Sequence, residues 1–591
     1  MTALRAPKFQ RPPLDGSLSI AEIYDWHVDH NPNHPIFVYA TGIRGGDIKN
    51  ISYSQFSDAC HRAGFILADL FGVDPYGARD DYPVVGILST AGIPLLTHKF
   101  VIVQIDLFAC FIDTITTYTT IIGLLRLGVV PFPISPRFSA HVVAELVKNA
   151  KVSHLLVNND RHLQSIVDAA VSLIQNSTPV KIHSLPENEV LYSDTWTPRL
   201  PKKTYLHSSP GIIVHSSSST SEFPKVVPWT VGMQIQHARV PVPPNQNSHD
   251  LRGAVFSCHS IELFHAFGLL LLYWTPAAGF TLGTFKPSSP AVLPSAEFCF
   301  HGIRVTNSEY ALTHTRFLEE WATDTNKLSF LKTLKAVLFG GKVLKQSAGE
   351  ILSQSGVKLS NTYGSTEGGH FTAVPADHAG ECWDYFQRSP QCGLNFLDQG
   401  DGTFHGIVIP TAQQESAFKA GHQETKYFAT GDLMVPHPTR KDYWKVIGRV
   451  DDQIMLSSGE VVHPIRLENI VTSNPYIKAA QLFGQARPHL GVLVDLRDVP
   501  QDLLEGPIES LREVIWPTVQ LMNDRYPSFC SVSREMIVVV SSAKPMLYTP
   551  KGLPKRAQNL RIYRDEIDKS YEGYGDPLLN SHPALMPRSV L

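Results

Sequence analysis

The chain has few cysteines, and their arrangement would hold neither a disulfide framework nor a structural metal. Seven cysteines are scattered through 591 residues, without a Cys-x-x-Cys pair or a His/Cys group at zinc spacing. A reduced, intracellular compartment is therefore expected. An excess of one charge is also lacking, because 51 Lys and Arg face 54 Asp and Glu, for a formal net charge of −3. This balance excludes the strongly basic character typical of proteins that bind nucleic acid or anionic membranes.

Long apolar runs are missing as well. The most apolar window, 92–112, contains His98, Lys99, Gln104 and Asp106, so it would make a poor membrane-spanning helix. The N-terminus has no apolar stretch of a secretory signal. The final Ser-Val-Leu lacks the basic residue of a peroxisomal address. We expect a cytoplasmic protein with no membrane and no nucleic-acid partner.

Most of the chain shows the pattern of a globular α/β protein. Hydrophobic residues make up 43% of it and charged residues 18%, which is ordinary globular composition. The pattern predicts strands at 84–88, 152–157, 211–214 and 334–339, and helices at 116–127 and 141–149. Strands that alternate with helices predict parallel-rich sheets covered on both faces. After about residue 450 the elements become shorter, which predicts a smaller α+β unit.

The strongest local pattern is a strand that runs into a cluster of hydroxyl side chains and ends at a lysine. It reads Val214-His215-Ser216-Ser217-Ser218-Ser219-Thr220-Ser221-Glu222-Phe223-Pro224-Lys225. Backbone N–H groups and hydroxyls in such a loop can surround phosphate oxygens, while the lysine adds a positive charge. It is not a Walker loop, because GxxxxGK[ST] is absent. A flexible serine-rich linker is the alternative, but the preceding strand and the terminal Pro-Lys favour phosphate binding.

This loop resembles the phosphate loop of the adenylate-forming superfamily, which includes acyl-CoA synthetases, adenylation domains of nonribosomal peptide synthetases and firefly-type luciferases. The usual pattern there is Thr/Ser-Ser-Gly-Ser/Thr-Thr-Gly-x-Pro-Lys. Here Ser218 stands where a glycine is usual, and the stretch before Pro224 is one residue longer. The resemblance implies that the nucleotide is bound by Ser216, Ser217, Ser218, Ser219, Thr220 and Lys225.

Further motifs follow in the order of that family. Residues 361–368, which begin at Asn361, resemble its YGxTE motif. The resemblance implies that Tyr363 stacks on adenine, Thr366 contacts the α-phosphate and Glu367 holds Mg²⁺. An aromatic face for a base, a hydroxyl for a phosphate and a carboxylate for a hard cation suit these tasks. The alternative is a surface turn with a helix cap.

Two later motifs resemble the parts of the family that bind ribose and join the domains. Thr430-Gly431-Asp432 is similar to the TGD motif, whose aspartate accepts the ribose hydroxyls. Residues 448–452 resemble the next motif, in which Arg449 is implied to contact ribose and phosphate and Asp451 to be the hinge. The alternative for Asp432 is an aspartate in an ordinary turn. Each of these two motifs alone is weak evidence for the family. Their order along the chain is more specific than any one of them.

The resemblance extends to the acid pocket. Leu-Phe-His-Ala-Phe-Gly around His265 and Phe267 resembles the acyl-side motif, and the pair Gly340-Gly341 resembles its acid-binding wall. The resemblance implies a catalytic role for His265 near the substrate carboxylate, and a satisfied core histidine is the alternative. Amino-acid-activating relatives carry an aspartate here for the α-ammonium, whereas the only acid in this stretch, Glu262, is out of register. An aryl, α-keto or fatty acid is therefore expected rather than an α-amino acid.

The catalytic lysine of the family usually lies in a C-terminal Gly-Lys pair. In this chain the stretch reads Tyr-Thr-Pro-Lys551-Gly-Leu553-Pro-Lys555, so a leucine occupies the expected register. The Thr-Pro-Lys-Gly form resembles fungal adenylate-forming reductases, in which an adenylation domain precedes a carrier and a reductase. We assign the catalytic role to Lys551.

The resemblance implies an acid–thiol ligase type of enzyme. A small carboxylic acid would react with ATP and Mg²⁺ to give acyl-AMP and pyrophosphate, and the acyl group would pass to a thiol, phosphopantetheine of a carrier or CoA. Two alternatives remain open at this point. One is a free-standing acyl-CoA ligase. The other is a catalytically impaired AMP-binding relic or a fragment of a larger adenylation–carrier–reductase enzyme.

The expected fold is a large N-terminal, multi-subdomain α/β body, residues 1–450, followed by a small α+β lid, 451–575, and a tail, 576–591. Residues 92–112 interrupt the join between the strand at 84–88 and the next helix with an unpatterned apolar stretch. We interpret this stretch as a retained intron that is translated in frame. A genuine extra hairpin or helix is the alternative.

Overall fold

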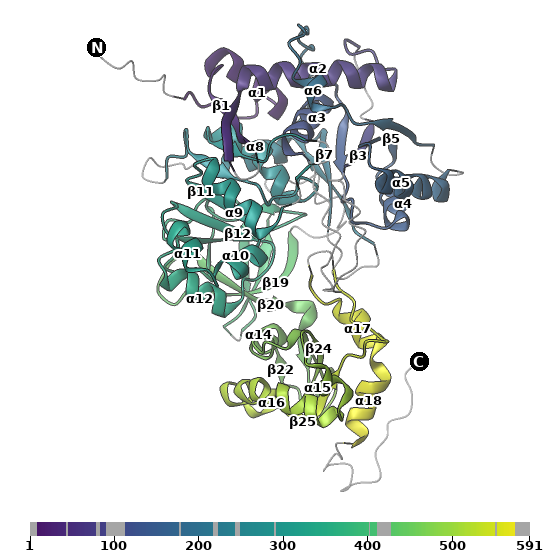
Figure 1. Ribbon diagram of the computed structural model, residues 1–591, viewed down its shortest axis with the longest axis vertical. Coiled ribbons are helices and arrows are strands. Elements are labelled where there is room, and N and C mark those ends of the chain that lie inside the picture. Colours follow the sequence, from purple (N-terminus) through teal and green to yellow (C-terminus); the bar gives the residue numbers. More distant parts are fainter. Residues whose placement is uncertain are drawn as a thin grey trace.

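A computed structural model describes most of the chain. The described residues are 9–42, 45–77, 83–89, 113–175, 179–216, 223–242, 249–288, 291–292, 294–400, 402–409, 427–549 and 552–573. Figure 1 shows a large body and, beyond the end of its sheet at β20 (Tyr443–Arg449), a smaller unit that carries the C-terminal part of the chain. Within the described ranges no helix has the length and apolar character needed to cross a membrane.

One large mixed sheet forms the centre of the body. Its order is β17 (Leu394–Asp398), β18 (Phe404–Val408), β19 (Phe428–Pro436), β20, β16 (Phe386–Gln387), β13 (Leu359–Thr362), β12 (Ala336–Gly340), β11 (Tyr310–Thr313), β9 (Val255–Ser257), β10 (Thr281–Gly283), β1 (Pro35–Gly42) and β2 (Gly45–Ser52). Neighbours run parallel from β1 to β16 and antiparallel from β16 to β17. The parallel part of this sheet agrees with the sequence prediction.

A second, wholly parallel sheet has the order β4 (Val130–Pro133), β3 (Val84–Leu88), β5 (Val152–Val157) and β6 (Lys181–Ser184). The helices around it are α3 (Thr114–Arg126), α4 (Ala140–Asn149) and α5 (Arg161–Ile174). The predicted strands at 84–88 and 152–157 are confirmed. Helix α3 begins earlier than predicted because the Asp113 carboxylate accepts hydrogen bonds from two N–H groups of its first turn. The segment 92–112 lies outside the described residues.

The remaining elements of the body cover these sheets and flank their edges. They are α1 (Ile20–His30), α2 (Tyr53–Phe71), α6 (Asn188–Leu191), β7 (Pro210–His215), β8 (Val226–Thr230), α7 (Val231–Arg239), α8 (Ala266–Ala278), α9 (Ala296–Val305), α10 (Thr315–Trp321), α11 (Thr325–Leu331), α12 (Gln346–Gln354), β14 (Gly364–Ser365) and β15 (Gly369–His370). Helix α8 is buried from Gly268 to Ala278, which is the pattern of a helix in the middle of a core.

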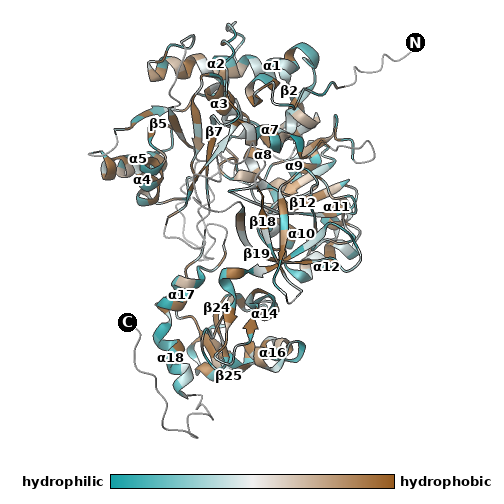
Figure 2. Ribbon diagram, turned by 180° about the vertical axis from the view of Figure 1, so that it is seen from behind, coloured by the Kyte–Doolittle hydropathy of each residue, from teal (hydrophilic) through white to brown (hydrophobic). Residues whose placement is uncertain are grey.

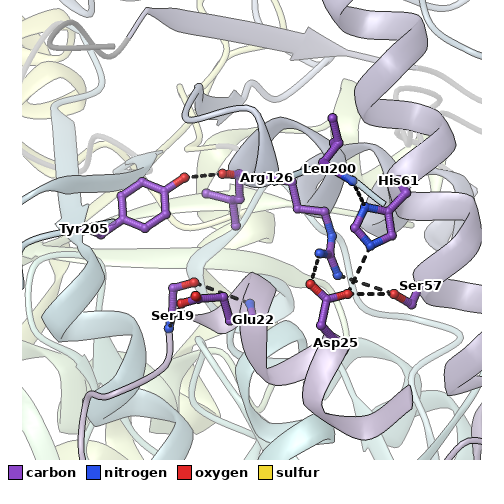
Figure 3. A network of polar contacts seen from close by, with 9 residues as sticks. Ser19, Glu22, Asp25, Ser57, His61, Arg126, Leu200 and Tyr205 are labelled. Carbon is purple, nitrogen blue, oxygen red and sulfur yellow. Dashed lines mark hydrogen bonds and ion pairs between the residues drawn. The ribbon is translucent and has the colours of Figure 1, made fainter. Parts of the chain in front are cut away.

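A buried polar network joins the first three helices (Figure 3). The Asp25 carboxylate of α1 accepts a hydrogen bond from Ser57 Oγ at 3.0 Å and lies 3.1 Å from His61 Nε2, both on α2. It also forms an ion pair with Arg126 at the end of α3. His61 Nδ1 in turn accepts the backbone N–H of Leu200 at 2.9 Å. The network therefore fixes how three helices and one loop meet.

The smaller unit is an α+β fold with its own apolar core. Its elements are η1 (Val450–Asp452), β21 (Ile454–Met455), β22 (Val461–Val462), α14 (Pro464–Val471), β23 (Ile477–Phe483), β24 (Leu490–Leu496), α15 (Gln501–Glu505), α16 (Ile508–Arg525), η2 (Ser528–Cys530), β25 (Val532–Val539), α17 (Arg556–Ile562) and α18 (Arg564–Gly573). Strands β23, β24 and β25 pair in that order, and Figure 2 shows β24 and β25 as apolar beside the hydrophilic helix α18. A large α/β body with a small α+β unit confirms the predicted fold class.

Candidate functional site

Several residues singled out in the sequence lie at one edge of the large sheet. Strands β9, β11, β12 and β13 run parallel, so their carboxyl ends meet at the same edge. Gly340 ends β12, Gly341 comes directly after it and Tyr363 follows β13, while His314, which the sequence did not single out, follows β11. Ligands of open α/β sheets bind beyond the carboxyl ends of the strands. This edge is therefore the candidate site.

Three predicted nucleotide-binding residues contact one another there. Tyr363 Oη donates to Asp432 Oδ2 at 2.6 Å, and Arg449 Nη1 lies 3.3 Å from Asp432 Oδ1. Burial, and then the charge of Asp432, raise the pKa of Tyr363 well above its usual value, so the hydroxyl stays protonated and donates. The Tyr363 ring stacks on Phe386, with ring centroids 4.9 Å apart. Predictions from three separate motifs thus converge on one cluster.

Strand pairing explains why this cluster forms. Asp432 on β19 lies directly opposite Arg449 on β20, within an antiparallel pair, so Asp432 belongs to a strand rather than a turn. Gly431 has a φ of +77°, and a Cβ there would lie 2.5 Å from Arg449 Nη2. Arg449 Nη2 also reaches Asp451 Oδ2 at 3.1 Å. Arg449 therefore connects the cluster with the segment at which the smaller unit begins.

The predicted phosphate and metal residues lie at the tip of a hairpin. Strands β14 and β15 pair across Thr366, Glu367 and Gly368, and Gly368 N–H donates to Ser365 Oγ at 3.0 Å. Trp229 Nε1 on β8 donates to the Thr366 carbonyl at 2.9 Å, which fixes the tip. No group of three metal-ligating side chains exists among the described residues. A half-exposed single carboxylate still suits Mg²⁺, which commonly takes one or two carboxylates and completes its shell with phosphates and water.

The hydroxyl-rich loop connects two paired strands. β7 and β8 are antiparallel, with His215 opposite Val226. Just beyond this pair, Ser216 N–H donates to the Lys225 carbonyl at 3.0 Å and Lys225 N–H donates to Ser216 Oγ at 2.9 Å. These bonds hold the two ends of the loop together. The predicted ligands Ser217, Ser218, Ser219 and Thr220 lie outside the described residues.

Two of the expected acid-pocket residues, His265 and Phe267, lie at the start of α8, and the other two, Gly340 and Gly341, lie at the end of β12. His265 is the N-cap residue of α8 and does not cap it with its side chain. The ring of Phe267 stacks on His370 of β15, with centroids 6.2 Å apart. Gly340 allows close approach, because a Cβ would lie 2.2 Å from Thr362 Oγ1, and Gly341 has a φ of +78°.

Asn361, a further predicted nucleotide ligand, donates from its amide Nδ2 to the carbonyl of Asp384 at 3.4 Å. It lies on β13, two positions before Tyr363.

One group of functional candidates was not anticipated as a unit. The buried Glu262 carboxylate is in contact with Arg137, with His265 Nε2 at 3.5 Å and with His314 Nε2 at 3.5 Å. In the sequence Glu262 stands out only as an acid that is out of register in the acyl-side motif. Glu262 and His265 are three positions apart, but Arg137 and His314 are distant from them in sequence, which hides the cluster.

The C-terminal lysine region forms a closed turn. Thr549 N–H donates to the Leu553 carbonyl at 2.7 Å, and Gly552, with a φ of +73°, donates to the Thr549 carbonyl at 2.8 Å. Leu553 is 40% exposed, and Lys555 is the N-cap residue of α17. Lys551 itself lies outside the described residues.

Comparisons with known proteins agree with this arrangement. A family model described as "AMP-binding enzyme" matches residues 110–398, and one described as "AMP-binding enzyme C-terminal domain" matches residues 451–575. Among curated proteins, Adenylate-forming reductase Nps10 of Heterobasidion annosum is 34% identical over 95% of this chain and 50% of the relative. A carboxylic acid reductase of Neurospora crassa is 26% identical over 67% of this chain and 37% of the relative. The chain thus spans about half the length of its first curated relatives.

Solved structures agree on the fold. The o-succinylbenzoate CoA synthetase of Bacillus subtilis in complex with ATP and magnesium has a TM-score of 0.66 at 15% identity, covering 91% of this chain and 98% of that one. An anthranilate CoA ligase in complex with anthranoyl-AMP gives 0.66 at 15% identity, over 93% and 97%. The ordered motifs, the family models and the curated relatives lead to one conclusion. The chain belongs to the adenylate-forming, AMP-binding enzyme superfamily and is most like the fungal adenylate-forming reductases.

Proposed function

We propose that this chain activates a carboxylic acid that has no α-ammonium group, and does so by adenylation. The acid carboxylate attacks the α-phosphate of ATP, a new C–O–P linkage forms, and pyrophosphate leaves. A carboxylate is a poor electrophile, and the adenylate supplies a good leaving group for the next step. The contact between Tyr363, Asp432 and Arg449 at the carboxyl edge of the sheet carries this proposal.

Each part of the site has a defined task in this reaction. Asp432 would accept the ribose hydroxyls, because each carboxylate oxygen can accept more than one hydrogen bond. The loop closed by Ser216 and Lys225 would donate to the phosphates. Glu367 would hold Mg²⁺, which neutralises phosphate charge when bound. Positioning and charge stabilisation supply most of the catalysis in such a transfer.

We further propose that residues 1–450 act as the body and residues 451–575 as a lid that turns about Asp451. In the ligase-type second step, the lid would admit a thiol, and the acyl group would pass from AMP to sulfur. The thiol is phosphopantetheine on a carrier or CoA. The carrier is favoured by the similarity to relatives named reductases that are about twice as long as this chain.

ATP–pyrophosphate exchange across an acid panel tests the proposal. The panel contains aryl, 2-oxo and fatty acids, and compares each 2-oxo acid with the amino acid of the same side chain. We expect exchange with at least one acid and none with its 2-amino counterpart. Exchange restricted to amino acids, or AMP binding without exchange for any acid, would contradict the proposal, and the second result would favour the impaired relic. CoA thioester formation without a carrier would favour the free-standing ligase.

A further inference from the structure

A buried carboxylate organises the acid side of the site. The Glu262 side chain is 4% exposed, whereas the side chains around it, Arg137, His265 and His314, are 15%, 22% and 31% exposed. The carboxylate is therefore more deeply buried than each of the three nitrogen-bearing side chains that contact it. Burial alone would raise the pKa of Glu262, but His314, Arg137 and His265 together hold it below its usual range, so the carboxylate stays ionised.

The two oxygens of Glu262 divide their contacts. Oε1 accepts from the Arg137 guanidinium, and Oε2 is 3.5 Å from the Nε2 atoms of both His265 and His314. These residues come from three separate segments: the turn after β4, the start of α8 and the end of β11. Because both oxygens are engaged internally, Glu262 does not present a free carboxylate to an ammonium group.

The cluster adjoins both halves of the candidate site. The His265 ring lies 6.1 Å, centroid to centroid, from the His215 ring, which immediately precedes the hydroxyl loop at Ser216. His314 follows β11, and the neighbouring strand β12 ends at Gly340. The cluster thus adjoins both the end of the strand that leads into the hydroxyl loop and the strand end that carries the expected acid wall. Nitrogen donors at this position suit a carboxylate that must approach the α-phosphate.

We propose that Glu262 is a positioning residue of the acid site, which gathers Arg137, His265 and His314 into one donor face for the substrate carboxylate. This inference rests on the proposed function and deepens it, because a face of this kind favours an anion without an ammonium group. The Glu262 carboxylate touches no reacting atom and acts through the groups that it orients.

Acid-dependent exchange kinetics of Glu262→Gln test the inference. Glutamine keeps the shape of the side chain and removes its charge, so the three donor residues lose the carboxylate that orients them. We expect the KM for the acid to rise about ten- to hundredfold, the scale of a lost charge-assisted hydrogen bond. The KM for ATP and the kcat at saturating acid should stay within about twofold. The reason is that the donor face binds the substrate carboxylate equally strongly in the ground state and in the transition state. Glu262→Asp should restore part of the affinity.

Glu309→Gln is the matched control, because Glu309 pairs with Lys335 in an exposed position away from the site. If the unmodified chain is active and Glu262→Gln leaves the KM for the acid unchanged, only this inference is overturned. The same holds if the KM for ATP rises as much as the KM for the acid. A parent inactive with every acid would overturn the proposed function and this inference with it. If Glu262→Gln does not fold, His314→Gln carries the same expectation, and an unchanged KM for the acid there would also overturn it.

Discussion

At the scale of single residues, the nucleotide cluster depends on groups that are distant in sequence. Tyr363 and Asp432 are 69 positions apart and yet share a hydrogen bond. The motifs predicted that both would serve one ligand, and the strands β13, β19 and β20 explain how they meet. The assignment of Asn361 as a nucleotide ligand stays a prediction; in the structure its amide donates to the carbonyl of Asp384.

The lysine assignment gives a prediction at this scale. Lys551→Ala should lower ATP–pyrophosphate exchange about a hundredfold, because a positive charge at the α-phosphate would be lost in the transition state. Lys555→Ala should change it by less than threefold, since this residue begins α17. Single-turnover adenylate formation measures the rate of this step in each variant. An equal loss of rate in the two variants would contradict the assignment of Lys551 as the catalytic lysine.

At the scale of elements, the network of Figure 3 predicts a stability effect. Asp25→Asn would leave the Arg126 guanidinium, whose side chain is 5% exposed, without its counter-charge. Breaking one partner of a buried pair costs about 3–5 kcal/mol, so the unfolding midpoint should fall clearly in a urea titration. Asp250→Asn is the control, because that side chain is 54% exposed in its pair with Arg252 and should cost less than about 1 kcal/mol. Similar shifts in both variants would contradict the role of the network.

The junction between β3 and α3 gives a second prediction for an element. Without residues 92–112, the connection from Leu88 to Thr114 would consist of Ser89, Thr90, Ala91 and Asp113. A length of about 2–6 residues is usual for such strand–helix loops. We expect a transcript that lacks codons 92–112, and a deletion variant that yields at least as much folded protein as the full chain. A spliced message that still encodes the segment would rule out the intron interpretation.

At the scale of the whole molecule, buried histidines make stability depend on pH. Burial lowers the pKa of His27 and His259 to about 3 and that of His215 and His237 to about 4. The unfolded chain would bind protons at these imidazoles below about pH 6.5, whereas the folded chain would not. Their contribution to stability is therefore complete above that pH and is lost as the pH falls towards 4.

We expect the free energy of unfolding to fall by up to about 1.4 kcal/mol per pH unit for each of these histidines as the pH drops below 6.5. Thermal unfolding at pH 5.0, 6.0, 7.0 and 8.0 measures it. The unfolding temperature should be nearly constant between pH 7.0 and 8.0 and should drop in the acid range. An unchanged temperature from pH 8.0 to 5.0 would contradict this account.

The sequence by itself determined the fold class, the family and most of the nucleotide motifs, because these depend on local patterns: apolar periodicity, hydroxyl runs and short ordered signatures. Only the tertiary structure decided that Asp432 lies in a strand opposite Arg449 and that Glu262 collects three residues from separate segments. Strand register and burial set such contacts, and neither can be read from the spacing of residues along the chain. Glu262, an acid out of register in the motif, contacts Arg137, His265 and His314 only because the fold brings these residues together.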